Sequence, residues 1–233
     1  LGQTPRLFGT VGRDFDDYAA WLTRTGVDIS LVQKIDDVFM PSFFANIDLD
    51  NNQIGSFYAG AMTYSKNYRI ADVMPEKPDI VIVSPNDPQA MSNLCRECRE
   101  RGIRFIYDPS QQVARLNGEE LRASMEGAYM LVINDFEALM IESKAGLTLD
   151  DLRGMFEVLI ITHGKDGSFI YTNGECIQIP IFEANEIKDP TGAGDAYRAG
   201  LLTGLARGFP LKLTGEMGAL CATYALEHLG TQN

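Results

Sequence analysis

The most informative stretch of the sequence is "IKDPTGAGDAYRAGLLTGLARG", residues 187–208. It places two glycines around an alanine and then an aspartate, Asp195, directly before a helical pattern. Helix N-termini carry unpaired N–H groups and the positive end of the helix dipole. Glycines at positions 192 and 194 let the backbone approach an anion closely. The run "TGAG" therefore predicts an anion hole built from main-chain donors.

Asp195 conflicts with this interpretation at first, because its carboxylate would repel a bound phosphate. The conflict disappears if Asp195 accepts a proton from a hydroxyl group while that hydroxyl attacks phosphorus. The N–H groups of residues 192–194 would then meet the charge that develops on the phosphoryl group. A structural alternative stays open, because an aspartate in the first turn of a helix is favourable on dipole grounds alone and glycines often close a turn.

Two better-known phosphate motifs are absent from the sequence. There is no G-x-x-x-x-G-K-[ST], so a Walker-type nucleotide site is excluded. Gly192 and Gly194 lack the third glycine of the dinucleotide fingerprint, because Tyr197 stands in its place. An oxidoreductase that binds a dinucleotide is therefore not favoured.

Upstream of this stretch, short apolar runs alternate with helical patterns. The runs lie at residues 79–83, 103–107, 129–133 and 157–162, and the helical patterns near 87–101, 117–126 and 135–144. Continuously apolar strands separated by helices indicate a parallel sheet that is buried on both faces. The pattern predicts an α/β fold with right-handed crossovers.

Two stretches instead indicate antiparallel hairpins. Residues 38–59 alternate apolar and polar side chains around "DNNQ", and residues 167–181 do so around "TNGE". The first lies between α/β units, so we expect it to leave the main sheet as a flap or lid. The sequence predicts one main domain over residues 1–233 with this β appendage.

Composition excludes several classes of partner. The formal charge of −12 argues against nucleic acid or an anionic membrane as the main partner. The longest apolar runs are too short to cross a bilayer, and no secretory signal is visible. Cys95 and Cys98 form a C-x-x-C inside a helical pattern, and the chain has only two histidines, His163 and His228. We expect reduced thiols in a cytoplasmic protein rather than a zinc or redox site.

The motifs, taken together, resemble one family. "DPTGAGDAYRAGLLTGLARG" closely resembles the C-terminal signature of the ribokinase-like carbohydrate kinases, the PfkB family. "NDFE" (134–137) and "THGKDG" (162–167) resemble that family's N-x-x-E and T-x-G-x-x-G motifs, in the family's order. The resemblance implies a ribokinase-like three-layer α/β/α fold with a mostly parallel central sheet and a small β lid at residues 38–59.

The resemblance also covers the start of the chain. Residues 7–30 are similar to the family segment that follows its glycine-rich sugar-binding motif. We expect that motif, the family's first strands and its last helix to lie outside this sequence, together with most contacts to the sugar.

The match implies roles for individual residues of the phosphate site. Asp195 would be the catalytic base, and the anion hole would consist of Gly192, Ala193 and Gly194. Asn134 and Glu137 would act through water on Mg²⁺ and the phosphates, which suits a cation that prefers oxygen ligands and keeps several waters. An Asn cap opening a helix, with Glu at the third position, is an equally open interpretation of "NDFE".

Further residues are implied around the nucleotide. Thr162, Gly164 and Gly167 would line it at the end of a buried strand, where α/β sheets bind ligands. Asp189 resembles the position that helps to hold a monovalent cation, K⁺, in some members. The adenine pocket would come from the helix at 213–230, where small residues could admit a flat ring: Gly218, Ala219 and Ala222. A tightly packed core helix remains the alternative for these residues.

The resemblance implies an ATP-dependent kinase that transfers the γ-phosphoryl group to a primary hydroxyl of a sugar or nucleoside. "YDPSQQVARL" (107–116) and "YALEHLGTQN" (224–233) favour a nucleoside. The alternatives are a kinase for a simple sugar such as ribose or fructose, and a non-catalytic binding or regulatory protein on the same fold. The aromatic residues of the lid are Phe39, Phe43, Phe44, Phe57 and Tyr58. They would stack on a base or pack against a partner subunit in a homodimer, because uncovered strand edges attract partners.

Overall fold

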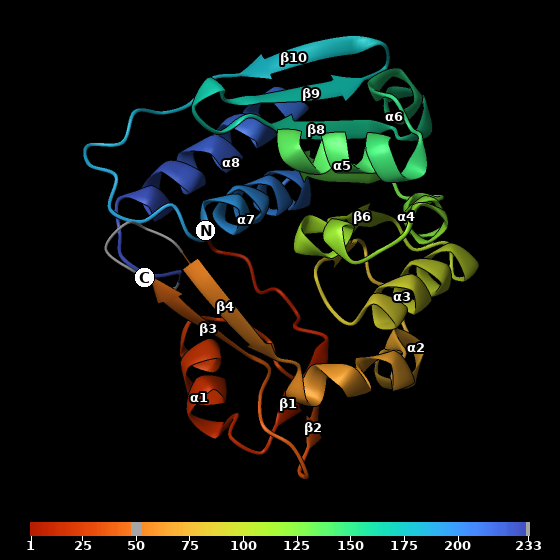
Figure 1. Ribbon diagram of the computed structural model, residues 1–233, viewed down its shortest axis with the longest axis vertical. Coiled ribbons are helices and arrows are strands. Elements are labelled where there is room, and N and C mark those ends of the chain that lie inside the picture. Colours follow the sequence, from red (N-terminus) through yellow and green to blue (C-terminus); the bar gives the residue numbers. More distant parts are fainter. Residues whose placement is uncertain (48–52, 232–233) are drawn as a thin grey trace. The chain divides into compact units, whose positions relative to one another are not determined.

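The computed structural model describes residues 1–47 and 53–231 (Figure 1). The chain divides into two compact units, residues 2–103 and residues 104–233, and Leu1 belongs to the second. The expectation of a single domain with a β appendage therefore stays a prediction. Among the described residues, no helix combines the length and the apolar character that a membrane span requires.

The unit of residues 2–103 opens with two parallel strands joined by a helix. β1 (Gly9–Gly12) pairs with β2 (Val32–Ile35), and α1 (Asp16–Arg24) lies between them in the chain. Leu22 of α1 packs in one core with Val11 and Phe15. The unit continues with η1 (Gly60–Asn67), α2 (Ile70–Val73), β5 (Val81–Val83) and α3 (Pro88–Glu100). The strand predicted at 79–83 and the helix predicted near 87–101 are confirmed.

The predicted lid is an antiparallel hairpin of β3 (Ser42–Ile47) and β4 (Gln53–Tyr58). Phe43 lies opposite Phe57, and its ring covers Gly55, where an added β carbon would come within 2.8 Å of the ring. Side chains 43 and 44 leave opposite faces of the strand, yet they are 62% and 61% exposed. Both faces of the hairpin are therefore open within this unit. The predicted "DNNQ" turn lies outside the described residues, except for Gln53.

The two thiols of the C-x-x-C are buried in α3. Asp87 caps this helix by accepting from the amides of Gln89 and Ala90. Burial raises the pKa of both Cys95 and Cys98 to about 12, so each stays a protonated thiol at neutral pH. No group of three or more His, Cys, Asp or Glu residues that could hold a metal ion occurs among the described residues. The expectation of reduced thiols rather than a zinc or redox site stays a prediction.

The unit of residues 104–233 is built on a twisted sheet. β6 (Phe105–Tyr107), β7 (Met130–Asn134) and β8 (Val158–Thr162) run parallel, and β9 (Ser168–Thr172) and β10 (Glu175–Ile179) extend the sheet as an antiparallel hairpin. Three of these strands carry the predicted apolar runs. The hairpin turns at Asn173 and Gly174, whose φ values of 49° and 77° fit a tight type I′ turn.

Helices cover both faces of this sheet. The helical elements of the unit are η2 (Ser110–Ala114), α4 (Gly118–Met125), α5 (Asp135–Ala145), α6 (Leu149–Met155), η3 (Gly164–Asp166), α7 (Ala193–Ala206) and α8 (Leu211–Leu226). Figure 1 shows α5 in front of the sheet and α8 behind it. The strand interior is fully buried, as in β6, where all three side chains are 0% exposed. The α/β class is confirmed.

Helices α7 and α8 pack closely through glycines. A β carbon on Gly200 would lie 2.5 Å from the Met217 carbonyl oxygen, and one on Gly218 would lie 2.9 Å from the Tyr197 carbonyl oxygen. Ala219 is buried as well. Gly218 therefore packs against α7, as the packed-helix alternative expects, and the adenine pocket at residues 213–230 stays a prediction.

Candidate active site

Polar groups gather where the three parallel strands of the second unit end. Asp108 follows the last residue of β6, Asn134 ends β7, and Thr162 ends β8. Asn134 lies directly opposite Thr162 in the parallel pairing of β7 with β8. Ligands of α/β sheets bind at this carboxyl edge. The structure thus brings two of the predicted motifs to one edge of the sheet.

Helix α5 begins at this edge with a complete capping box. Asn134 Oδ1 accepts from the Glu137 amide at 2.7 Å, and Glu137 Oε2 accepts from the Asn134 amide at 2.9 Å. The Asn134 side-chain amide also donates to Glu137 Oε1 at 3.0 Å. The cap that the sequence left open as an alternative is therefore present. It closes the N-terminus of α5 with the helix's own side chains.

Glu137 is a carboxyl group held in an unfavourable place for its charge. It is only 8% exposed. Burial raises the pKa of Glu137 above its ordinary value, and the Asn134 amide and the Arg198 guanidinium offset part of that rise. A carboxylate that has lost water but keeps lone pairs suits a cation that retains its own water shell. The donor set of Asn134 and Glu137 thus fits outer-sphere contact with Mg²⁺.

The T-x-G-x-x-G motif forms the turn between β8 and β9. The His163 amide donates to the Gly167 carbonyl at 2.8 Å. Gly167 has φ of 85°, and a β carbon there would lie 2.2 Å from the Ile179 carbonyl oxygen, so the fold itself requires this glycine. Gly164, with φ of 53°, has no atom within 4 Å of such a β carbon. The contacts of Thr162 and Gly164 with the nucleotide stay a prediction.

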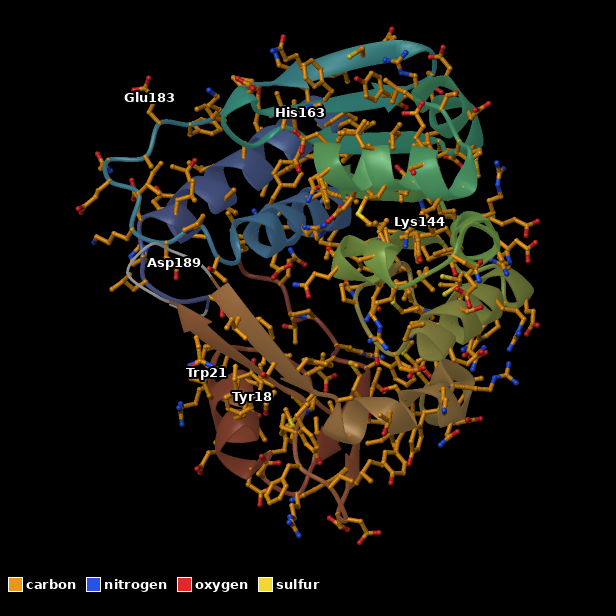
Figure 2. The ribbon with its side chains drawn as sticks, viewed as in Figure 1. Tyr18, Trp21, Lys144, His163, Glu183 and Asp189 are labelled. Atoms are coloured by element: carbon orange, nitrogen blue, oxygen red, sulfur yellow. The ribbon has the colours of Figure 1, made fainter. Side chains whose placement is uncertain are left out.

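His163 is the second residue of this motif and directly follows β8 (Figure 2). Its Nδ1 is 3.8 Å from Asp135 Oδ2, and its ring meets Phe169 edge to face at 5.2 Å between centroids. These contacts fix the ring against the start of α5 and against β9.

Helix α7 begins in the opposite way to α5, because no side chain caps it. Its N-cap is Gly192 with φ of 85°, a left-handed conformation that favours glycine. Among the described residues, no acceptor binds the amides of Gly192, Gly194 or Asp195, whereas the Ala193 amide donates to the Pro190 carbonyl at 3.3 Å. Asp195 is exposed in the first turn. The predicted anion hole thus has unpaired amides at residues 192, 194 and 195.

Asp189 orders the loop that leads into α7 (Figure 2). Its Oδ1 accepts from the Thr191 amide at 2.8 Å, and its Oδ2 accepts from the Gly230 amide at 3.0 Å. The hydrogen bonds from Thr191 and then Gly230 hold the pKa of Asp189 below its usual value. This carboxylate therefore ties the loop to the segment that follows α8. Its role toward a monovalent cation stays a prediction.

A buried ion pair at the same edge was not predicted from the sequence. Arg198 of α7 meets Asp108, with Nε 2.6 Å from Oδ2 and Nη2 donating to Oδ1 at 2.6 Å. Ser110 adds its hydroxyl, which donates to Asp108 Oδ1 at 2.7 Å. A polar "DPS" directly after a buried strand was the available signal. Its partner, Arg198, lies 90 positions away in the chain, so no short stretch of sequence indicates the contact.

The preceding residue of α7, Tyr197, is anchored to a different strand. The hydroxyl groups of Tyr197 and Ser168 lie 2.9 Å apart, and both side chains are buried. Tyr197 therefore ties the start of α7 to β9, and Arg198 ties it to the end of β6. These two contacts hold the uncapped N-terminus in place across the edge of the sheet.

Known proteins share this architecture along the whole chain. The family described as pfkB family carbohydrate kinase matches residues 1–233. The nucleoside kinase of Methanocaldococcus jannaschii is 31% identical over 234 residues, covering 100% of this chain and 76% of that protein. The nucleoside kinase of Methanothermobacter thermautotrophicus is 32% identical over 235 residues, covering 100% and 75%.

Solved structures agree with the sequence relatives. The Burkholderia thailandensis nucleoside kinase in complex with inosine superposes with a TM-score of 0.94 at 33% identity, covering 100% of this chain and 77% of that one. Its complex with ADP-inosine gives 0.93 at 33% identity and covers 73% of that chain. The ribokinase-like fold is thereby confirmed. The chain belongs to the pfkB family of carbohydrate kinases.

Proposed function

We propose that the protein is an ATP-dependent nucleoside kinase, which transfers the γ-phosphoryl group to a primary hydroxyl of a nucleoside. The observation that carries this proposal is the uncapped start of α7, where unpaired amides and Asp195 meet in one turn. Relatives that are nucleoside kinases along the full chain, one of them solved with inosine, support a nucleoside as the acceptor.

Asp195 carries the proton in the proposed reaction. The hydroxyl oxygen of the acceptor forms a bond to the γ-phosphorus while the bond from that phosphorus to the leaving oxygen of ADP breaks. The proton of the hydroxyl passes to the Asp195 carboxylate, which later releases it to solvent. This role suits a carboxylate that is exposed and has no hydrogen-bond partner among the described residues.

The amides at the start of α7 supply the electrostatic part. Negative charge grows on the phosphoryl oxygens as the group moves, and preorganised N–H donors lower the energy of that state without having to reorient. Gly192 and Gly194 keep side chains away from the donors. The positive end of the α7 dipole adds to the same field.

The nucleotide and its cation belong to the edge formed by β7 and β8. Thr162 and Gly164 would line the nucleotide, and Gly167 would shape the turn that carries them. Mg²⁺, when bound with ATP, neutralises phosphate charge, and Glu137 and Asn134 would hold it through its water shell. Both oxygens of Asp189 already order the loop through the amides of Thr191 and Gly230. Asp189 would contribute to a K⁺ site with these two contacts in place.

The surroundings of the reaction are part of the proposal. All four cysteines are free, which suits a reducing compartment such as the cytoplasm. Both faces of the lid hairpin are exposed. This supports an arrangement in which one face lies toward the acceptor and the other toward a second copy in a homodimer. Sedimentation of the wild type against Phe43→Lys tests the dimer, and a monomeric wild type would exclude it.

The proposal is tested by an acceptor screen that follows ADP release. The panel contains inosine, adenosine, guanosine, cytidine and uridine, with ribose and fructose as sugar acceptors, each with and without Mg²⁺ and K⁺. We expect kcat/KM for the best nucleoside to exceed that for either sugar. A sugar as the best acceptor would favour the sugar-kinase alternative. No turnover with any acceptor, combined with measurable nucleoside binding, would favour the non-catalytic alternative.

A further inference from the structure

We propose that Arg198 is a further catalytic residue, whose Nη1 donates to the transferring phosphoryl group beside the amides of α7. The inference rests on the proposed kinase function and extends it by one side chain. Arg198 stands three residues after Asp195, so the two lie on the same side of the helix. The carboxylate would serve the attacking hydroxyl, and the guanidinium would serve the phosphoryl group.

One edge of the guanidinium is fully engaged by the protein. Nε and Nη2 face the two oxygens of Asp108, each at 2.6 Å, and Nη2 also donates to the Ser110 hydroxyl at 3.0 Å. The Nε contact is an ion pair without hydrogen-bond alignment. The Asp108 side chain is only 2% exposed and that of Arg198 is 13% exposed. A two-point contact in such a place sets the plane of the guanidinium.

The other edge of the guanidinium faces the first turn of α7. Nη1 has no acceptor among the described residues, and it lies 2.9 Å from the position that a β carbon on Gly194 would take. Gly194 therefore leaves room for the guanidinium against the backbone of this turn. The free donors of Nη1 and the unpaired amides of residues 194 and 195 thus lie within one turn of each other.

The segment that carries Ser110 is held by hydrogen bonds from another helix. Ser110 has φ of 39°, which is rare for a residue other than glycine. Lys144 of α5 donates to the carbonyl oxygens of Val113, Ala114 and Leu116, at 2.8, 2.7 and 2.9 Å. These bonds fix the end of η2, whose first residue is Ser110. Asp108 and Ser110 thus hold Arg198 before any ligand binds, as preorganised stabilisation requires.

The electrostatics point to the phosphate side of the site. Arg198 and Asp108 both act on the charge of Glu137, the residue proposed to serve the nucleotide and its cation. An arginine stays charged at every physiological pH and cannot take the proton of the acceptor. Its function at this position is therefore to meet negative charge with a donor, and arginine is suited to phosphoryl oxygens.

The test compares Arg198→Met with a double variant, Asp108→Asn with Arg198→Met. The single variant leaves Asp108 buried without its counter-charge, which destabilises the fold, whereas the double variant leaves a neutral pair. Arg122→Met is the matched control, because Arg122 is another arginine of the same unit that donates to protein oxygens, here the carbonyl oxygens of Ala145 and Gly146. Thermal unfolding midpoints are measured for all variants.

One rate and three affinities then decide the inference. We expect single-turnover phosphoryl transfer to fall about 10²- to 10³-fold in both Arg198 variants, with inosine affinity close to that of the wild type and no change in Arg122→Met. Affinity for ADP with aluminium fluoride, which mimics the transferring phosphoryl group, should fall in both Arg198 variants while affinity for ADP changes little. The double variant should regain stability without regaining rate.

A double variant that transfers phosphate at nearly the wild-type rate would overturn the role of Arg198, because the pair would then be structural. Unchanged affinity for ADP with aluminium fluoride would overturn it as well. The proposed function fails separately, if the wild type turns over no acceptor at all. In that event the aluminium fluoride measurement still decides whether Arg198 binds a phosphoryl group.

Discussion

Helices α5 and α7 start at the same edge of one sheet, and they satisfy their first amides in opposite ways. α5 uses Asn134 and Glu137 in a capping box, so its N-terminus is closed by its own side chains. α7 starts at Gly192 without a side-chain cap and is held by Tyr197 and Arg198 through contacts with other elements. An uncapped helix start leaves its first amides open to an anion, and α7 is held in place instead by contacts further along the helix.

Gly192→Asn should have the largest effect, because it places a side chain at the open start of α7. The side chain would cover or bind the open amides, and we expect kcat to fall about 10²- to 10³-fold, the usual cost of losing such a donor set. The left-handed backbone should cost about 1 kcal/mol of unfolding free energy. Gly146→Asn is the control, because Gly146 ends α5 with φ of 61° and a β carbon there would meet no atom closer than Arg122 Nη2, at 3.8 Å. Equal kcat in the two variants would contradict the open-terminus account.

Glu137→Gln separates the cap of α5 from its charge. Glutamine can keep the capping box, so we expect little loss of stability, whereas kcat/KM for MgATP should fall about 10- to 100-fold, as for other residues that act on a metal through its water. Glu120→Gln is the control, because Asn117 and Glu120 form the same box at the start of α4. A loss of kcat/KM as large in Glu120→Gln would remove the special role of Glu137.

The same variant carries a pH prediction. Burial raises the pKa of Glu137, so this carboxyl takes up a proton at a higher pH than an ordinary glutamate, and activity should fall there as pH is lowered. The folded state holds that proton more tightly than the unfolded state, so the contribution of Glu137 to unfolding free energy falls as pH rises through this range. Both effects should be absent from Glu137→Gln in pH profiles of kcat/KM and of thermal unfolding.

Tyr197→Phe is expected to have the smallest effect. It removes one of the two contacts that hold α7 but leaves Arg198 in place. The loss should be about 1 kcal/mol of unfolding free energy, the net worth of one hydrogen bond, with kcat nearly unchanged. A double-mutant cycle with Ser168→Ala measures this contact directly. A large loss of kcat in Tyr197→Phe would show that the tyrosine, rather than the arginine, sets the start of α7.

Local chemistry explains which parts of this molecule were predictable. The "TNGE" turn and the capping box in "NDFE" involve residues within four positions of one another, so their geometry is written in short stretches of sequence. The buried strands could be predicted from their continuous apolar runs. Because these signals lie in short stretches of sequence, the α/β class and the positions of the three motifs along the chain could be predicted.

Distance along the chain explains what could not be predicted. Asp108 and Arg198 meet only because β6 and α7 come together in the fold, and a single sequence shows no link between them. Gly167 and Gly218 show a second limit, because the sequence does not indicate which backbone packs against a glycine. A glycine predicted to serve the nucleotide is required by the nearby Ile179 backbone, and one predicted to admit adenine is required by the packing of α7 on α8.

The central claim is that the carboxylate at the open start of α7 is the base of the phosphoryl transfer. Single-turnover transfer to inosine in Asp195→Asn tests it most directly, with ATP and inosine affinities measured on the same protein. We predict a rate lower by about 10²- to 10⁴-fold, the usual contribution of a general base, with both affinities close to those of the wild type. A rate near that of the wild type, at unchanged affinities, would contradict the account.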